Sequence, residues 1–345
     1  MLTHGNVIAN VSSVMYQMME HTIRGEDILM SYLPLAHMFE RNCENALFME
    51  GGAVAFYRGD VKTLSDDMKI AKPTLLPAVP RLLTRIFCKI QDSVKASFVK
   101  SFLLNTAYYF KQKNIEKTKI IRNDTVWDKF VFHKIRETLG GNVRLIMSGS
   151  APLNSNIFEF LRCTLGCVVT EGYGQTECVA PCTLTFPSDI QLGHVGSPLS
   201  CASIKLSDVP EMGYLASQGK GEVLVKGPIV FQGYFKDPER TKLALSDDGW
   251  LRTGDIGMWT ENETLKIIDR KKNIFKLSQG EYVAPEKIEN IYAQCAIVAQ
   301  IFVYGESIKS SLIAILIPDQ IILEMWAKNN NINQTFVELC QNKVM

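Results

Sequence analysis

The chain has 345 residues, of which 46% are hydrophobic, so it can bury a large core and is long enough for two domains. Its 37 lysines and arginines nearly balance its 36 aspartates and glutamates, and this formal net charge of +1 excludes a strongly basic nucleic-acid-binding protein. The nine cysteines are too dispersed for a small disulfide-rich domain and no secretory signal opens the printed sequence, so we expect free thiols in a reducing, cytosol-facing compartment.

The first half of the chain alternates between helical and strand patterns. Val7 to Met18 carries apolar residues at helical spacing. We predict strands at 27–35, 53–57, 74–79, 143–148 and 167–170, and helices at 40–49, 64–69, 81 to about 113, 127–139 and 154–163. This alternation predicts an α/β fold with a mostly parallel sheet flanked by helices.

The predicted helix after Arg81 is rich in phenylalanine, leucine and lysine, including Phe98 and Phe102 beside Lys95 and Lys100. Two interpretations stay open: an amphipathic helix that packs on the sheet, or a surface helix that touches a membrane. No apolar run approaches the ~20 residues that cross a bilayer.

Two neighbouring strands of the predicted sheet end in conspicuous sequences. The first runs into Gly149, Ser150 and Ala151, and the second, 167–170, runs into the heptapeptide 171–177. Because parallel strands leave a sheet at the same edge, we expect Gly149, Ser150 and Ala151 to face Tyr173 across one crevice.

The heptapeptide suits a nucleotide phosphate and its metal ion. Gly172 and Gly174 allow a ligand to approach the backbone, Tyr173 offers a flat face to a heterocycle, Thr176 a hydroxyl, and Glu177 a hard oxygen for Mg²⁺. The alternative is a purely structural turn, because two glycines in a turn need no ligand.

Four cysteines, 163, 167, 178 and 182, lie close together in the sequence. Their spacing fits zinc poorly, and we expect them to be small buried side chains.

From Val195 to Asp269 the pattern changes to short strands with tight turns, which predicts a small β-rich subdomain. Its one helix, 237–245, has Asp237 as N-cap and Pro238 at the first helical position. The carboxylate of Asp255, in a Gly-Asp turn, can accept hydrogen bonds from two vicinal hydroxyls, as a ribose presents them.

The last part of the sequence, from residue 269 onward, predicts a linker and a small α+β domain. Residues 269–273 are charged and lack apolar anchors, which is typical of a solvated linker. A hairpin follows at 275–283 with Gly280 near its tip, then a helix from Pro285 and strands at 298–304 and 311–317.

The heptapeptide together with residues 250–255, 268–273 and 279–282 resembles the adenylate-forming superfamily, and within it the long-chain fatty acyl-CoA synthetases of animal type. The resemblance runs from Met1 to about Gln320, and 268–290 is its longest continuous part. It implies ATP-dependent activation of a long-chain fatty acid to an acyl-adenylate, then thioester formation with coenzyme A. ATP or AMP, Mg²⁺ and CoA are the implied cofactors and co-substrates.

The resemblance also implies residue roles, with the adenine between the loop at Gly149 and the tyrosine ring. The implied nucleotide-binding and CoA-site residues are Gly149, Ser150, Ala151, Gly172, Tyr173, Gly174, Gln175, Asp255, Arg270, Lys272 and Gly280, and the implied catalytic residues are Thr176, Glu177 and His37. Asp255 and Arg270 would contact the ribose, Glu177 would hold Mg²⁺, and Lys272 would be the hinge of a mobile C-terminal domain. His37 would lie beside the fatty carboxylate, although a histidine after a strand is also a common structural residue.

We accordingly expect an incomplete large α/β domain at 1–194, a β-rich subdomain at 195–269, and the hinge with a truncated C-terminal domain at 270–345. The family's phosphate loop and its late lysine are not among the 345 residues, so we expect the chain alone to have little ligase activity. A catalytically dead isoform that acts as a binding or regulatory partner is the alternative. The resemblance implies the cytosolic face of the endoplasmic reticulum or mitochondrial outer membrane, with a possible homo-oligomer.

Overall fold

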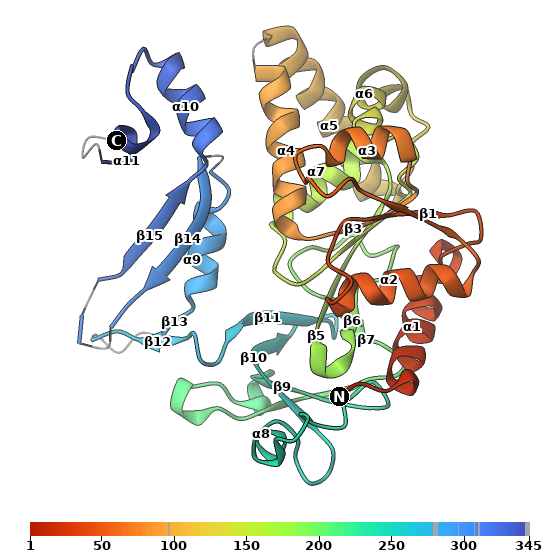
Figure 1. The fold of residues 1–345 in the computed structure, drawn as a ribbon, viewed down its shortest axis with the longest axis vertical. Coiled ribbons are helices and arrows are strands. Elements are labelled where there is room, and N and C mark those ends of the chain that lie inside the picture. Colours follow the sequence, from red (N-terminus) through yellow and green to blue (C-terminus); the bar gives the residue numbers. More distant parts are fainter. Residues whose placement is uncertain (96, 279–281, 296, 307, 310, 342–345) are drawn as a thin grey trace. The chain divides into compact units, whose positions relative to one another are not determined.

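The computed structural model describes residues 1–95, 97–278, 282–295, 297–306, 308–309 and 311–341. They form two compact units (Figure 1). The first comprises Met1–Thr253 and Gly257–Ile267, and the second Gly254–Ile256 and Ile268–Met345.

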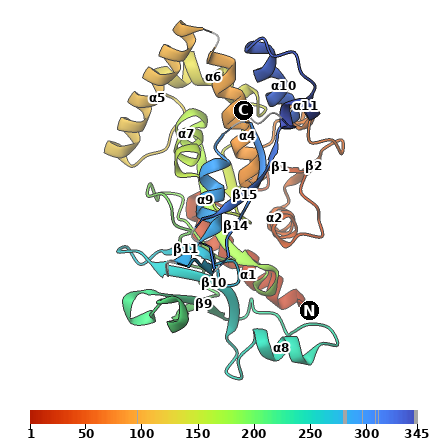
Figure 2. The same ribbon diagram turned by 90° about the vertical axis from the view of Figure 1, so that its left-hand side faces the viewer.

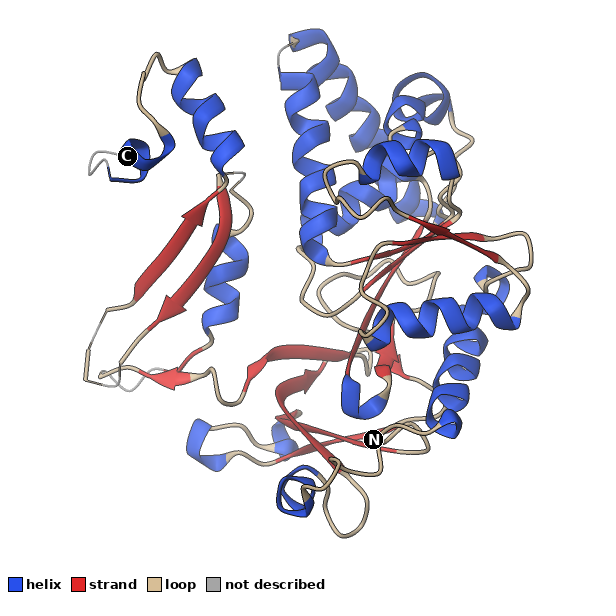
Figure 3. Ribbon diagram, viewed as in Figure 1, coloured by secondary structure: helices blue, strands red, loops and turns tan. Residues whose placement is uncertain are grey.

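A seven-stranded sheet organises the first unit (Figure 3). Its order is β2-β1-β3-β4-β5-β6-β7, the first five strands being parallel and the last two antiparallel to their neighbours. The strands are β1 Ile28–Ser31, β2 Ala53–Phe56, β3 Leu75–Ala78, β4 Leu145–Ser148, β5 Val168–Gln175, β6 Ala180–Leu184 and β7 Ser197–Pro198. The predicted α/β class with a mostly parallel sheet is confirmed.

Helices cover both faces of this sheet, because successive residues of a strand point to opposite sides. Leu29, on one face, packs with residues of α1 and α2, whereas Met30, on the other, packs with residues of α3 to α7. The helices are α1 His4–Met18, α2 Met38–Met49, α3 Leu64–Ala71, α4 Pro80–Lys95, α5 Phe98–Thr118, α6 His133–Glu137 and α7 Ser155–Leu165.

The single helix predicted from 81 to about 113 is wrong, because α4 and α5 are separate helices that pack side by side (Figures 1 and 2). Ser97 starts the second helix by accepting a hydrogen bond from the backbone N–H of Lys100. The helix predicted at 127–139 is a five-residue π-helix, Asp128–Phe132, followed by α6.

The predicted β-rich region contains a four-stranded sheet of order β11-β10-β9-β8. Its strands are β8 Ser203–Ser207, β9 Lys220–Lys226, β10 Leu251–Trp259 and β11 Leu265–Arg270. Helix α8, Pro238–Ala244, begins as predicted, with the Asp237 carboxylate accepting from the Arg240 N–H at 3.0 Å. Short 3₁₀ helices lie at Met19–His21, Thr176–Cys178, Pro210–Met212 and Ala216–Gln218.

The second unit contains two antiparallel strand pairs and three helices among its described residues. These are β12 Phe275–Lys276, β13 Tyr282–Val283, α9 Pro285–Tyr292, β14 Val298–Tyr304, β15 Ile313–Pro318, α10 Gln320–Asn329 and α11 Phe336–Gln341. Asp269 is fully buried and accepts hydrogen bonds from the N–H groups of Arg270 and Glu286. The prediction of a solvated linker is therefore wrong at Asp269, which is anchored to the first turn of α9.

The domain boundaries at 194/195 and 269/270 stay a prediction, since the two compact units reflect packing alone. Among the described residues, no helix combines the length and the apolar character that a bilayer crossing requires.

Candidate active site

The loop after β4 and the glycine-rich end of β5 lie at one edge of the sheet. Ser148, the last residue of β4, is opposite Glu171 in the parallel register, so both segments leave the same edge. A Cβ added to Gly149 would lie 3.4 Å from the carbonyl oxygen of Gly172. The fold thus brings together the two backbones that the sequence predicted to face one crevice.

The heptapeptide is not the loop that the sequence predicted. Strand β5 continues to Gln175, and its second half pairs antiparallel with β6, with a register shift between Tyr173 and Gly174. A Cβ on Gly174 would lie 1.4 Å from the carbonyl oxygen of Ala180. The absence of a side chain at Gly174 is therefore required by β6, with or without a ligand.

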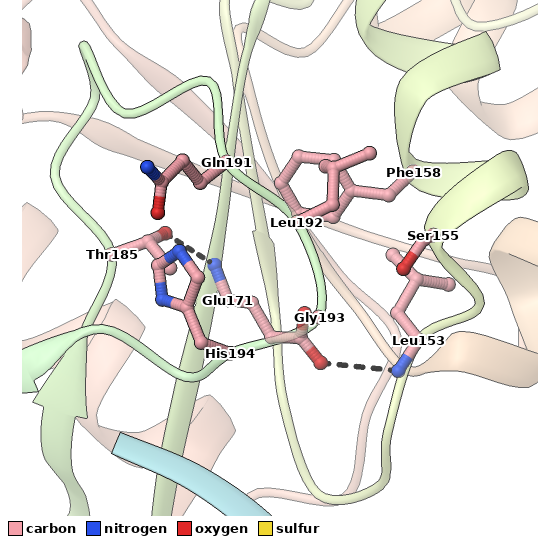
Figure 4. Close-up of a pocket in the computed structure, with 9 residues that line it drawn as sticks. All are labelled: Leu153, Ser155, Phe158, Glu171, Thr185, Gln191, Leu192, Gly193 and His194. Carbon is pink, nitrogen blue, oxygen red and sulfur yellow. Dashed lines mark hydrogen bonds between the residues drawn. The ribbon is translucent and has the colours of Figure 1, made fainter. Parts of the chain in front are cut away.

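The loop after β4 is pinned to β5 by Glu171, a residue to which the sequence analysis assigned no role. Its carboxylate accepts from the N–H of Leu153 at 3.1 Å, and its own N–H donates to the Thr185 hydroxyl at 2.9 Å (Figure 4). Burial raises the pKa of Glu171 to about 7, and the Leu153 N–H and the nearby His194 oppose this rise. The sequence signal for this role is the position of the Glu171 carboxylate directly after a buried β-branched run.

Unusual backbone conformations lie on both sides of this edge. Ser150 has a φ of 73°, and Val179 and Ala180, after the 3₁₀ turn, have φ values of 62° and 77°. Positive φ is rare for residues with a side chain, most of all for a β-branched valine. Ser150 is exposed, so the strained loop that was predicted to hold adenine is open to solvent.

The 3₁₀ turn after β5 carries the two predicted catalytic residues. Thr176 is exposed and Glu177 is half-buried. The Glu177 carboxylate accepts a hydrogen bond from the hydroxyl of Tyr234 at 2.8 Å, and its backbone carbonyl accepts from the N–H of Phe231 at 2.8 Å. No local sequence pattern singles out Tyr234, which is 57 residues away in the chain.

No cluster of three or more His, Cys, Asp or Glu side chains suited to a metal lies within the described part of the chain. One carboxylate at Glu177 nevertheless fits Mg²⁺, which commonly binds one or two carboxylates and completes its shell with water and substrate phosphate oxygens. The four cysteines weighed as zinc ligands, Cys163, Cys167, Cys178 and Cys182, are buried.

The two residues predicted for the ribose meet in the second unit. The Nε of Arg270 lies 3.8 Å from the Oδ1 of Asp255, and the N–H of Lys271 donates to the carbonyl of Gly254 at 2.7 Å. The predicted hinge residue Lys272 is exposed in the following turn. Gly280 lies outside the described residues.

His37, predicted beside the fatty carboxylate, is the N-cap of α2. Its Nδ1 accepts from the N–H of Phe39 at 3.2 Å, and its side chain is exposed. Helix capping is therefore a structural role for His37, which is one of the two alternatives that the sequence left open. Glu40 is one of the buried polar residues of this helix, and its carboxylate oxygens have no hydrogen-bond partner among the described residues. Burial raises the pKa of Glu40 to about 7; a nearby Ser31 hydroxyl opposes the rise and the charge of Glu44 reinforces it.

Comparison with protein families and with known proteins finds extensive similarity. A family model described as AMP-binding enzyme matches residues 1–235. The chain is 53% identical over 345 residues to human long-chain-fatty-acid–CoA ligase 6, with 99% of the chain and 49% of that protein covered. It is 47% identical over 349 residues to the Arabidopsis thaliana long chain acyl-CoA synthetase 7, peroxisomal, again with 99% and 49% covered. The chain thus spans about half the length of the curated relatives it matches.

Solved structures share the fold. The A-PCP didomain of a carboxylic acid reductase from Segniliparus rugosus, solved with AMP, gives a TM-score of 0.69 at 29% identity over 97% of this chain and 43% of that one. The Bacillus subtilis O-succinylbenzoate coenzyme A synthetase, solved with ATP and magnesium, gives 0.65 at 22% identity over 95% and 59%, a likeness of fold alone.

Proposed function

Since this chain belongs to the AMP-binding enzyme family, we propose that it acts as part of a long-chain fatty acid:CoA ligase that forms AMP. The observation that carries the proposal is the identity of about half of all residues, over nearly the whole chain, to long-chain-fatty-acid–CoA ligases. This similarity supports the enzyme over the alternative of a regulatory binding partner.

The first half-reaction joins the fatty carboxylate to the α-phosphate of ATP and releases pyrophosphate. Because two anions must meet, the barrier is mainly electrostatic and positional. In the proposal Gly149, Ser150, Ala151 and Tyr173 hold the adenine, with Gly172, Gly174 and Gln175 forming the adjacent wall.

The proposed ribose contacts are Asp255, which accepts from the hydroxyls, and Arg270, whose proximity to Asp255 supports a shared ligand. Thr176 donates its hydroxyl to a phosphate and Glu177 holds the metal ion. Bound Mg²⁺ would neutralise part of the charge on the phosphates. His37 stays a candidate for the fatty carboxylate, from its exposed position at the start of α2.

In the second half-reaction the CoA thiolate attacks the acyl carbon, a carbon–sulfur bond forms, and AMP leaves with the electron pair of the broken C–O bond. We assign Lys272 to the hinge and the turn at Gly280 to the pantetheine path on family resemblance. The exposed position of Lys272 is compatible with the backbone rotation that a hinge requires.

A membrane surface is the proposed source of the substrate. Helix α5 has features of both a core-packing helix and a membrane-contacting helix. Leu104 and Ala107 are buried in the core, whereas the side chains of Phe98 and Phe102 are 86% and 61% exposed. We assign this exposed start of α5, beside Lys100, to contact with lipid, into which long-chain fatty acids partition. The Phe98→Asp/Phe102→Asp variant should sediment less with anionic vesicles than the control Phe130→Asp, and equal sedimentation of both would refute this assignment.

The organelle and the oligomeric state follow from resemblance only. The endoplasmic reticulum or mitochondrial outer membrane and a possible homo-oligomer remain part of the proposal.

Nucleotide binding by the purified 345-residue chain tests the proposed function. Calorimetry with AMP, and with a non-hydrolysable acyl-adenylate analogue, should show binding that Tyr173→Ala and Asp255→Ala each weaken by about tenfold, or about 1.4 kcal/mol. Tyr292→Ala, at an exposed position on α9, is the control. Absence of binding by the folded wild-type chain, or unaltered binding by both variants, would contradict the proposal.

A further inference from the structure

We infer that Tyr234 is a positioning residue for Glu177, fixing one carboxylate oxygen so that the other remains available to the metal–nucleotide complex. This inference rests on the proposed function. Oε1 of Glu177 accepts from the Tyr234 hydroxyl at 2.8 Å, whereas Oε2 has no hydrogen-bond partner among the described residues. The two oxygens of one carboxylate therefore have different environments.

The loop that carries Tyr234 is docked on the Glu177 turn by a second contact. The N–H of Phe231 donates to the backbone carbonyl of Glu177 at 2.8 Å, so backbone and side chain of Glu177 are held by the same loop. The rings of Phe231 and Tyr234 pack edge to face, with centroids 4.9 Å apart. Phe231 is buried in the core, which makes it the fixed support of the tyrosine ring.

Helix α8 fixes the other side of Tyr234. The Tyr234 N–H donates to the Thr241 hydroxyl at 2.9 Å, and that hydroxyl donates to the Asp237 carbonyl at 2.7 Å. The Arg240 guanidinium lies 5.4 Å from the centre of the tyrosine ring. Gly233 has a φ of 122°, and a Cβ there would lie 2.6 Å from the Thr241 side chain, so glycine permits the close approach of the loop to α8.

This anchoring would hold the Glu177 carboxylate in place before a metal ion binds. A glutamate has three side-chain torsions, and immobilising them at the moment of metal binding costs conformational entropy. A hydrogen bond that fixes the carboxylate beforehand removes part of that cost, as partners of metal-ligating carboxylates do in general.

The test compares nucleotide binding with and without metal. In the Tyr234→Phe variant of the full chain, which keeps the ring, we expect the apparent Kd for Mg²⁺ in the presence of saturating ATP to rise by about tenfold. AMP binding without metal should change by less than twofold. Tyr16→Phe, at a largely exposed tyrosine on α1, is the matched control and should change neither quantity.

A double-mutant cycle shows whether Tyr234 acts through Glu177. In a Glu177→Gln background, Tyr234→Phe should have less than a twofold further effect on Mg²⁺ dependence. A purely structural role of Tyr234 would change thermal stability equally in both backgrounds and leave the Mg²⁺ requirement unaltered.

The outcomes separate the two hypotheses. A wild-type chain that binds neither AMP nor ATP overturns the proposed function and, with it, the role of Tyr234. Normal AMP binding, with an unaltered Mg²⁺ requirement in Tyr234→Phe, overturns the inference alone.

Discussion

Individual residues at the end of β5 have structural roles in addition to their proposed functional roles. Gly174 was selected from the sequence as a place where a ligand approaches the backbone, and the structure shows β6 making that approach. Glu171 belongs to the same heptapeptide, and its buried carboxylate holds the neighbouring loop. A motif of this kind therefore combines residues kept by packing with residues available to a ligand.

Replacing Gly174 with alanine should destabilise the protein strongly. The new Cβ would overlap the Ala180 carbonyl, and backbone of two paired strands must move to relieve the overlap. We expect a loss of about 2–4 kcal/mol in the free energy of unfolding, measured by guanidinium denaturation. Gly5→Ala is the control, because Gly5 likewise has no positive φ and its Cβ would meet only the Thr3 hydroxyl, at an ordinary contact distance of 3.6 Å. Equal losses in the two variants would contradict the steric explanation.

Glu171 should make stability depend on pH. Its pKa is about 7 in the folded protein against an ordinary value of 4.5, so the folded state favours the protonated carboxyl. The resulting stabilisation is fully present below about pH 4.5 and is lost as the pH rises through 7. The free energy of unfolding should fall by about 3 kcal/mol over this range.

The Glu171→Gln variant has no titrating carboxyl at this position, so it lacks this pH-dependent contribution to stability. Relative to the wild type, it should gain stability between pH 5 and pH 8, as measured by denaturation at both values. Glu261→Gln, in an exposed turn, is the control and should follow the wild-type profile. Parallel profiles of Glu171→Gln and wild type would show that Glu171 does not titrate in this range.

At the scale of elements, polar contacts determine where some helices begin and end. Apolar periodicity predicts these boundaries only roughly. Most strands and helices lie within a few residues of their predicted positions, because their patterns are local. The break between α4 and α5 depends instead on the Ser97 cap, and the π-helix lies where Asp128 is buried.

The link between α5 and the π-helix is a buried ion pair of Lys111 and Asp128, whose side chains are both fully buried. Asp128 also accepts from Arg136 and Thr125. Lys111→Met should cost about 3–5 kcal/mol of unfolding free energy, because it leaves Asp128 buried with its charge poorly compensated.

Adding Asp128→Asn to Lys111→Met should restore part of the loss, since it removes the buried charge. Lys113→Met, which breaks an exposed pair with Glu116 on the same helix, should have little effect. Denaturant titrations of these variants check the prediction, and a Lys111→Met loss no larger than that of Lys113→Met would refute it.

At the scale of the whole molecule, the nine cysteines are all free thiols, five of them buried. Cys295 and Cys340 are exposed, whereas burial raises the pKa of Cys163 and Cys167 to about 12 and keeps them protonated. A thiol-reactive chromophore such as Ellman's reagent should therefore react rapidly with Cys295 and Cys340 in the native protein, and with all nine cysteines after denaturation.

Cys295→Ser and Cys340→Ser should each remove one rapidly reacting thiol. A total below nine in denaturant without reductant would indicate a disulfide and contradict the prediction.

The sequence by itself determined the α/β class, the order of most elements, the adjacency of the loop after β4 to the end of β5, and the family. These follow from local periodicity, from the geometry of parallel strands and from continuous motifs. Only the tertiary structure decided that β5 continues through the glycines to meet β6, that Glu171 is buried, and that Tyr234 holds Glu177. The physical reason is that register, burial and hydrogen-bond partners depend on segments distant in the chain, such as the 57 residues between Glu177 and Tyr234, and no local pattern records them.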